Sequence, residues 1–140
     1  MTTAAAVALA FDLGGVFLIA VFGVIYLTRR QFMPYHAVAV GKQWLELDPP
    51  VRVLLLALMR ASGGLCIAVT FLELVLLYVA GWHGARWALY AAAVGGLLVT
   101  AAFVAGMTLV TRNTQAKPPW IVAVVGGSFF VIGLGAATQA

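Results

Sequence analysis

Charged residues are scarce in this sequence. Asp, Glu, Lys and Arg make up only 9% of the 140 residues, and just four residues are acidic. Because a soluble domain carries charges at about a quarter of its positions, the composition excludes an ordinary water-soluble globular domain. The single cysteine, Cys66, also excludes a disulfide framework within the chain. What remains is a chain dominated by apolar side chains, which form 64% of it.

The apolar residues gather in four long runs. These runs cover residues 5–28, 53–80, 87–110 and 120–136. A hydrocarbon core about 30 Å thick needs about 20 apolar residues of helix, at a rise of about 1.5 Å each, so every run comes close to that length or exceeds it. The sequence therefore predicts an all-α polytopic membrane protein, in which one domain, residues 1–140, forms an antiparallel bundle of four transmembrane helices.

The basic residues predict the orientation of this bundle. The loop between the second and third runs holds only Arg86, whereas the other two loops hold Arg29, Arg30, Lys42, Arg52, Arg112 and Lys117. Basic residues concentrate on the cytoplasmic side of membrane proteins. We therefore expect a bacterial inner-membrane protein with both termini outside. The net charge of +4 reports this orientation, and no nucleic-acid partner is expected.

The longest loop, residues 31–48, mixes aromatic and charged side chains. Such a segment is typical of a short amphipathic helix at the headgroup boundary, here starting near Pro34 in the first cytoplasmic loop. Asp48, followed by two prolines, predicts the start of the second spanning helix. Basic and aromatic side chains around this loop are candidates for contact with a ligand or with anionic lipid headgroups: Arg29, Arg30, Tyr35, His36 and Trp44.

Three ionisable residues interrupt the apolar runs: Asp12, Arg60 and Glu73. Each costs roughly several kcal/mol if it faces lipid, so each needs a partner, water or a way to reach the surface. Arg60 lies near the cytoplasmic end of its helix and can extend to the headgroups. It also shares a helix face with Gly63 and Gly64, so we expect it to face the bundle interior and to be a further candidate for ligand or headgroup contact.

Asp12 and Glu73 are expected to converge near the outer leaflet from neighbouring helices. Helical side chains tilt toward the N-terminus, which directs Asp12 outward and Glu73 back into the membrane. Two acids in a low dielectric cannot both ionise cheaply. This arrangement suits proton or ion binding, with Thr70 and Ser62 on the same stripe as Glu73. It equally suits a structural hydrogen bond between the two carboxyls or from a carboxyl to a hydroxyl.

Motifs for catalysis and cofactor binding are lacking. The sequence contains no Ser-His-Asp order, no glycine-rich phosphate loop and no pair of cysteines. His36 and His83 fall on opposite sides of the membrane in the expected topology, which argues against a shared haem. A metal site around Met33 and His36 lacks diagnostic spacing. We therefore expect no catalytic residue, no metal and no cofactor.

Part of the sequence resembles known bacterial membrane proteins. Residues 32–36 (Phe-Met-Pro-Tyr-His), Trp44 and residues 58–65 together resemble small uncharacterised bacterial four-span proteins. Within the last segment, Arg60, Gly63 and Gly64 are similar to the Arg-x-x-Gly-Gly pattern of DoxX-like proteins. The resemblance implies a four-helix inner-membrane protein, and DoxX-like proteins are associated with redox-linked membrane complexes.

Three classes of function remain open. A non-catalytic module, either an accessory subunit or a bundle that binds lipid or another hydrophobic ligand, accounts for the short loops. A small proton- or cation-coupled transporter or channel accounts better for Asp12 and Glu73, and would act as an oligomer because four helices rarely enclose a pathway. A membrane enzyme acting on a lipid or quinone, using Arg60 and the two acids, ranks third. The expected partners are membrane lipids and either further copies of the chain or a larger membrane complex.

Overall fold

The structure is a computed structural model that describes residues 2–140. Within these residues the chain forms five α-helices, one 3-10 helix and no strand. Four helices are long and apolar enough to cross a membrane: α1 (Thr3–Thr28), α3 (Pro49–His83), α4 (Arg86–Asn113) and α5 (Trp120–Ala137). The short helices α2 (Pro34–Val40) and η1 (Trp44–Glu46) lie in the loop between α1 and α3. The prediction of an all-helical chain with four long apolar helices is confirmed.

The helix boundaries follow from local sequence. Helix α2 begins at Pro34, as the sequence predicts, and ends at Gly41. Helix α3 follows Asp48, the expected N-cap residue, although its side chain makes no capping hydrogen bond. It ends at Gly84, whose φ of 66° is left-handed and favours glycine over residues with a Cβ. This short turn joins α3 directly to α4.

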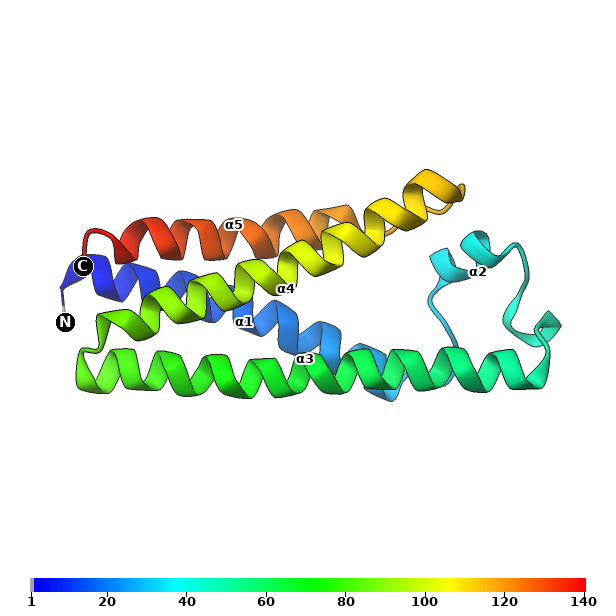
Figure 1. Ribbon diagram of the computed structural model, residues 1–140, viewed down its shortest axis with the longest axis horizontal. Helices are drawn as coiled ribbons and strands as arrows, with labels where there is room; N and C mark the ends of the chain where they lie inside the picture. The colour runs from blue at the N-terminus through cyan, green and yellow to red at the C-terminus, as the bar shows by residue number, and fades with distance from the viewer. Residues whose placement is uncertain (1) are drawn as a thin grey trace.

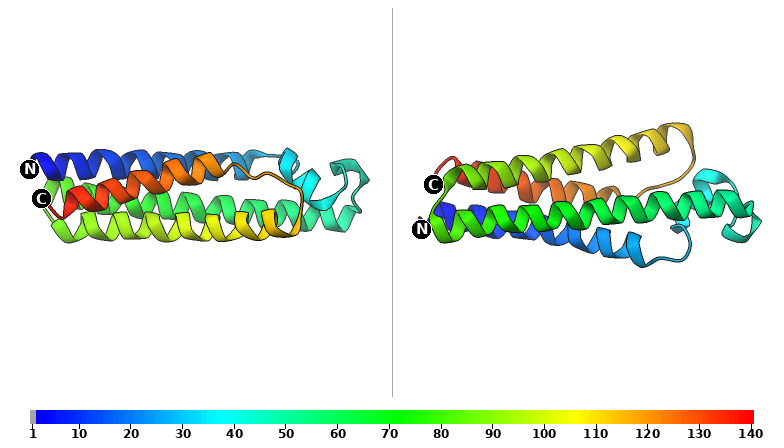
Figure 2. Two further views of the ribbon diagram at one scale, coloured as in Figure 1. Left: turned by 90° about the horizontal axis from the view of Figure 1, so that it is seen from above. Right: turned by 60° about the horizontal axis from the view of Figure 1, so that its bottom comes forward.

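The four long helices lie lengthwise beside one another, and the chain reverses direction between successive helices (Figure 1). Both termini lie at one end of the molecule, hereafter the terminal end, whereas α2 and η1 lie at the other, the α2 end. Helix α1 packs against α3 and α5, and α4 packs against α5 and α3. Helices α3 and α4 are close at the terminal end and separate toward the α2 end (Figure 2).

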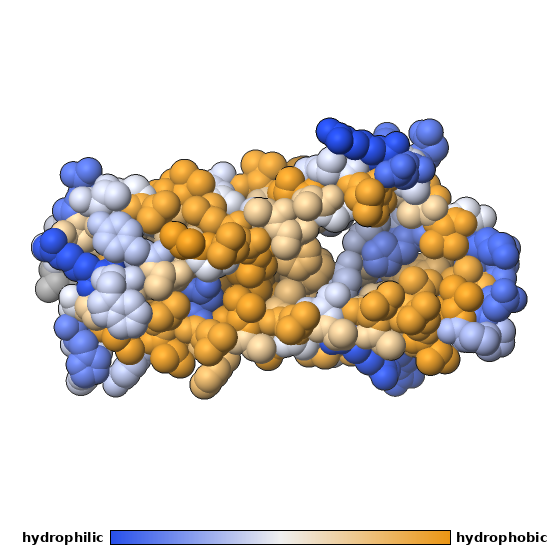
Figure 3. Space-filling view, viewed as in Figure 1, coloured by the Kyte–Doolittle hydropathy of each residue, from blue (hydrophilic) through white to orange (hydrophobic). Residues whose placement is uncertain are grey.

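The outside of the bundle is apolar. Large side chains such as Phe17, Leu65 and Ile121 are 66–79% exposed, and apolar residues cover much of the length between two more hydrophilic ends (Figure 3). Water would not tolerate so much apolar surface, which therefore suggests a protein embedded in a membrane.

Glycines bring the helices into close contact. A Cβ added at Gly63 of α3 would lie 2.8 Å from the Gly23 carbonyl oxygen of α1. Closer to the terminal end, the fully buried Phe130 ring of α5 fills the space between Gly15 of α1 and Gly96 of α4, where no added Cβ would fit. Small residues thus allow close approach of backbones where lipid supplies no hydrophobic drive for association.

Candidate functional site

The terminal half of the bundle contains the two buried acids of the described residues. Asp12 of α1 is 0% exposed and Glu73 of α3 is 3% exposed. No other charged side chain of residues 2–140 is buried. The bundle therefore encloses two carboxyl groups without enclosing a basic group to balance them.

Each carboxyl occupies space that a glycine leaves free on another helix. The Asp12 carboxyl packs against Gly133 of α5, where an added Cβ would overlap Oδ1 and lie 2.8 Å from Cγ. The Glu73 carboxyl packs against Gly95 of α4, where an added Cβ would overlap Oε1. The four helices therefore all contribute to the surroundings of the two acids, two by carrying them and two by making room.

The two acids lie on neighbouring levels of the bundle. Glu73 meets Gly95, the residue next to Gly96, while Asp12 precedes by about one turn the glycine that meets Phe130 on the opposite side. The charge of Asp12 acts on Glu73. The two carboxyls are therefore close enough to interact electrostatically, from the neighbouring helices α1 and α3.

Neither acid has the hydrogen bonds that a structural role requires. Both carboxyl oxygens of Asp12, Oε2 of Glu73 and the Thr70 hydroxyl are buried without a hydrogen-bond partner in residues 2–140. Leaving such groups unpaired costs about 1–3 kcal/mol each. The expected carboxyl–carboxyl or carboxyl–hydroxyl hydrogen bond is therefore not formed, and these oxygens remain free to bind a proton or an ion.

The candidate residues on α3 separate into two places. Thr70 lies about one turn before Glu73, and its buried hydroxyl belongs to the acid site. Ser62 is exposed and lines a different cavity of about 270 Å³, beside His36 and near the α2 end. Ser62 is therefore not part of the acid site, although it shares a helical stripe with Thr70.

The expectation that Arg60 faces the bundle interior is wrong. Its side chain is exposed on the flank of α3. The buried positions of this helix, Met59, Gly63 and Cys66 among them, point in a different direction. The shared face with Gly63 misled because a three-residue separation leaves about 60° between two side chains, enough to separate an exposed flank from a buried stripe.

The remaining sequence candidates gather at the α2 end. Arg29 and Arg30 are exposed there. The Tyr35 hydroxyl lies 2.7 Å from the hydroxyl of Tyr26, a hydrogen bond in which either can donate. Trp44 packs edge-on against Phe32, with 5.1 Å between ring centroids.

His36 is fixed by its neighbours in the α2 end. Its Nδ1 accepts a hydrogen bond of 3.3 Å from the Met33 amide. Its ring lies 4.2 Å from that of Tyr35, centroid to centroid. Burial lowers the pKa of His36 and raises the pKa of Tyr35, because both charged forms lose contact with water. The neutral forms of both side chains are therefore favoured.

One further cavity has no counterpart in the predictions. A groove of about 310 Å³ runs between α1, α4 and α5 on the side of Phe130 toward the α2 end. Its walls include Phe22, Tyr26 and Phe103. In the sequence these residues are ordinary members of apolar runs, so only tertiary packing identifies the groove.

The described residues contain no group of three or more His, Cys, Asp or Glu side chains placed to hold a metal ion. In comparisons with known proteins, the chain matches no protein-family model, no curated protein and no solved structure. These comparisons give no support to the resemblance to DoxX-like proteins, which stays a prediction.

Proposed function

We propose that this protein is a small transporter or channel subunit of a bacterial inner membrane, and that Asp12 and Glu73 bind the proton or monovalent cation on which its activity depends. The observation that carries this proposal is the pair of buried carboxyls that lack hydrogen-bond partners in residues 2–140. An ionisable residue inside a membrane protein more often serves transport than packing, because its burial is costly.

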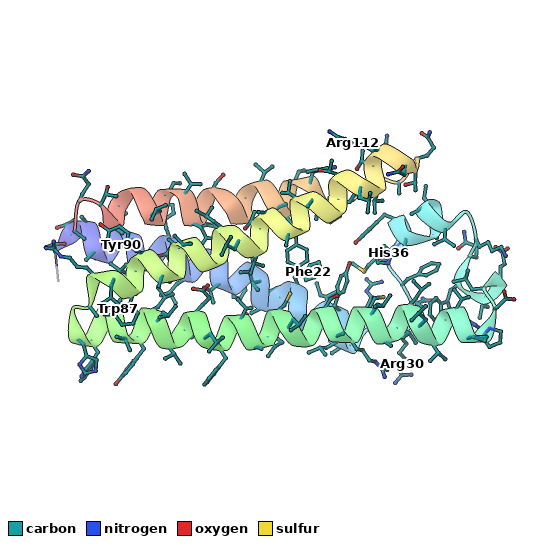
Figure 4. All side chains as sticks on the ribbon, viewed as in Figure 1. Phe22, Arg30, His36, Trp87, Tyr90 and Arg112 are labelled. Carbon is teal, nitrogen blue, oxygen red and sulfur yellow. The ribbon has the colours of Figure 1, made fainter. Side chains whose placement is uncertain are left out.

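The proposal includes a topology. The four long helices cross the membrane as an antiparallel bundle, with the terminal end outside and the α2 end in the cytoplasm. Support comes from the positions of the basic residues: Arg30 and Arg112 lie toward the α2 end, far from Trp87 at the terminal end (Figure 4). Helix α2 then lies along the cytoplasmic headgroup boundary.

The energetics favour uptake of a positive charge. An isolated carboxylate in an apolar interior is strongly destabilised, and two of them also repel each other. A proton or a cation bound between Asp12 and Glu73 removes both penalties. The Thr70 hydroxyl, which is buried nearby without a partner in residues 2–140, supplies a further oxygen ligand or a hydrogen-bond donor.

A pathway requires more than one copy of the chain. Phe130 is fully buried between α1 and α4 and closes the centre of a single bundle beside the acids. We therefore propose that the chain assembles as a homo-oligomer or within a larger membrane complex, where the ion reaches the acids along a subunit interface. An accessory or lipid-binding module ranks second, because it gives Asp12 and Glu73 no role.

Infrared spectroscopy tests this site directly, because the chain has only four acidic side chains. In proteoliposomes at neutral pH, we expect a protonated-carboxyl C=O band that disappears in Asp12→Asn or Glu73→Gln, or that shifts with Na⁺ or K⁺ if a cation binds. Flux driven by a pH or cation gradient should disappear in the same variants. The matched control is Glu46→Gln, at an exposed acid of η1, which should change neither signal.

Two results would contradict the proposal. One is a wild-type protein with four ordinary carboxylates at neutral pH and no response of their bands to Na⁺ or K⁺. The other is folded Asp12→Asn and Glu73→Gln variants that carry the wild-type flux.

A further inference from the structure

The groove between α1, α4 and α5 is shaped for a narrow apolar group. Its volume of about 310 Å³ is at the lower limit of small-molecule sites, about 300–1,000 Å³. Phe22 contributes to an aromatic wall: its ring stacks on Tyr26 at 4.1 Å and meets Phe103 edge-on at 4.5 Å. Gly126 and Phe130 line the groove from α5. A single hydrocarbon chain fits this space better than a bulky ring system.

Polar groups are confined to the α2 end of the groove. Tyr26 and Tyr35 both line it, and their hydroxyls are paired at 2.7 Å. One of the two protons is used within this pair, so the other hydroxyl proton is free to be donated. Arg29, at the end of α1, lies close enough to act electrostatically on Tyr26. The groove thus combines an apolar interior with a phenol donor and a guanidinium at one end.

The charge of the α2 end determines which headgroup fits. Six basic residues lie in the two loops at this end, against two acids, Glu46 and Asp48. The guanidinium of Arg112 lies at the far end of α4, while Phe22 and His36 lie in the space where α3 and α4 separate (Figure 4). This arrangement is complementary to an anionic headgroup.

We propose that the groove holds one acyl chain of an anionic phospholipid, whose phosphate contacts Arg29 and the Tyr26–Tyr35 hydroxyl pair. The apolar tail gains little by leaving other lipid tails, since both surroundings are apolar. The affinity therefore depends on the headgroup and on the fit of the tail. One basic residue near the membrane surface contributes about 1 kcal/mol to binding an anionic lipid, which corresponds to about fivefold in affinity. This site is separate from the acids and does not depend on the proposed transport function.

Native mass spectrometry of the full chain in mild detergent tests the site with two lipids that have identical tails, dioleoyl phosphatidylglycerol and dioleoyl phosphatidylcholine. We expect one phosphatidylglycerol to be retained, with about fivefold or greater preference over phosphatidylcholine. Arg29→Gln should reduce this preference about fivefold. Arg30→Gln is the control for total charge, because its side chain lies below α3 in the view of Figure 4, away from α4 and α5.

A second pair of variants tests the tail. Val122→Trp fills the groove from α5, and we expect it to weaken retention of both lipids by about tenfold, or about 1.4 kcal/mol. Val124→Trp is the matched control, because Val124 is an exposed valine of the same helix that does not line the groove. Circular dichroism and gel filtration check that both variants fold.

Several outcomes would overturn the proposal. Equal retention of the two lipids by the wild-type protein would do so without any variant. Equal loss in the Val122 and Val124 variants would remove the groove from the explanation. Retention of oleate in place of phosphatidylglycerol would show that the site takes a free fatty acid instead.

Discussion

Replacing Gly133 with alanine should disturb the bundle through a single contact, the one with Asp12. The added Cβ would overlap Oδ1 of the Asp12 carboxyl and approach its Cγ to 2.8 Å and its Oδ2 to 3.2 Å. Asp12 is fully buried and cannot swing into lipid without exposing a carboxyl to hydrocarbon. Either the carboxyl rotates into a poorer position, or α1 and α5 move apart.

The expected cost is that of overpacking a well-packed interior, about 1–3 kcal/mol. Alanine otherwise favours a helix over glycine by about 1 kcal/mol, so the same substitution without the contact should be neutral or stabilising. Gly135→Ala provides this control, because an added Cβ at Gly135 of the same helix meets nothing within 4 Å. In an Asp12→Ala background the contact is gone, and Gly133→Ala should then cost little. The double-mutant cycle should therefore give a coupling energy of about 1–3 kcal/mol.

The assay is unfolding of the purified protein from mild detergent by increasing SDS, followed by circular dichroism or by quenching of tryptophan fluorescence. The four proteins of the cycle and the Gly135→Ala control are measured side by side. Equal effects of Gly133→Ala and Gly135→Ala would refute the reasoning. So would a Gly133→Ala cost that is the same in the wild-type and Asp12→Ala backgrounds, because the Asp12 contact would then not be its cause.

Two further predictions concern the α1–α3 contact and the α2 segment. Gly63→Ala would bring a Cβ to 2.8 Å from the Gly23 carbonyl oxygen, whereas Gly64→Ala meets nothing within 4 Å. In the same SDS assay the former should therefore lose about 1–3 kcal/mol and the latter lose nothing, and equal losses would contradict the close backbone contact. Burial lowers the pKa of His36 below its usual 6.5, so the undocked segment binds protons more readily, and docking of α2 is stable above pH 6.5 and weakens as the pH falls through the lowered pKa. Hydrogen exchange of the Met33 amide, corrected for its intrinsic pH dependence, should accelerate on acidification in the wild type but not in His36→Gln; a pH-independent rate in the wild type would show that the histidine does not control docking.

Sequence reasoning predicted the elements of this fold well. Apolar runs of sufficient length can only be buried as helices when the solvent is a bilayer, because every backbone N–H and C=O then needs a partner within its own segment. Proline and glycine marked the boundaries: Pro34 begins α2, and Gly84 ends α3. The expected run of 53–80 was shorter than α3 because the charged and polar flanks, among them Arg52 and His83, continue the helix beyond its apolar part.

The candidate site was predictable only in part. The scarcity of charge singled out Asp12 and Glu73 as acids in apolar runs. Their hydrogen bonding was not predictable, because it depends on which residues face them from other helices. Gly95 and Gly133 make room for the carboxyls, yet they look like any other glycine of the sequence. Arg60 shows the same difficulty in reverse, since its helical face was read correctly to within about one-sixth of a turn and still led to the wrong surroundings.

The two halves of the bundle differ in what they leave unsatisfied. The terminal half is packed tightly around Phe130, and its unmet need is polar: carboxyl oxygens without hydrogen-bond partners in residues 2–140. The half toward α2 is open, and its unmet need is apolar: a groove of about 310 Å³ with an aromatic wall. In a membrane these needs attract different ligands, since a small positive ion fits the first and a hydrocarbon chain fits the second. Phe130 contacts both regions, lining the groove on one side and packing on Gly15 and Gly96 beside the acids on the other. A lipid tail that presses on this ring would act on the level at which Glu73 meets Gly95, so lipid occupancy and ion binding should influence each other through Phe130.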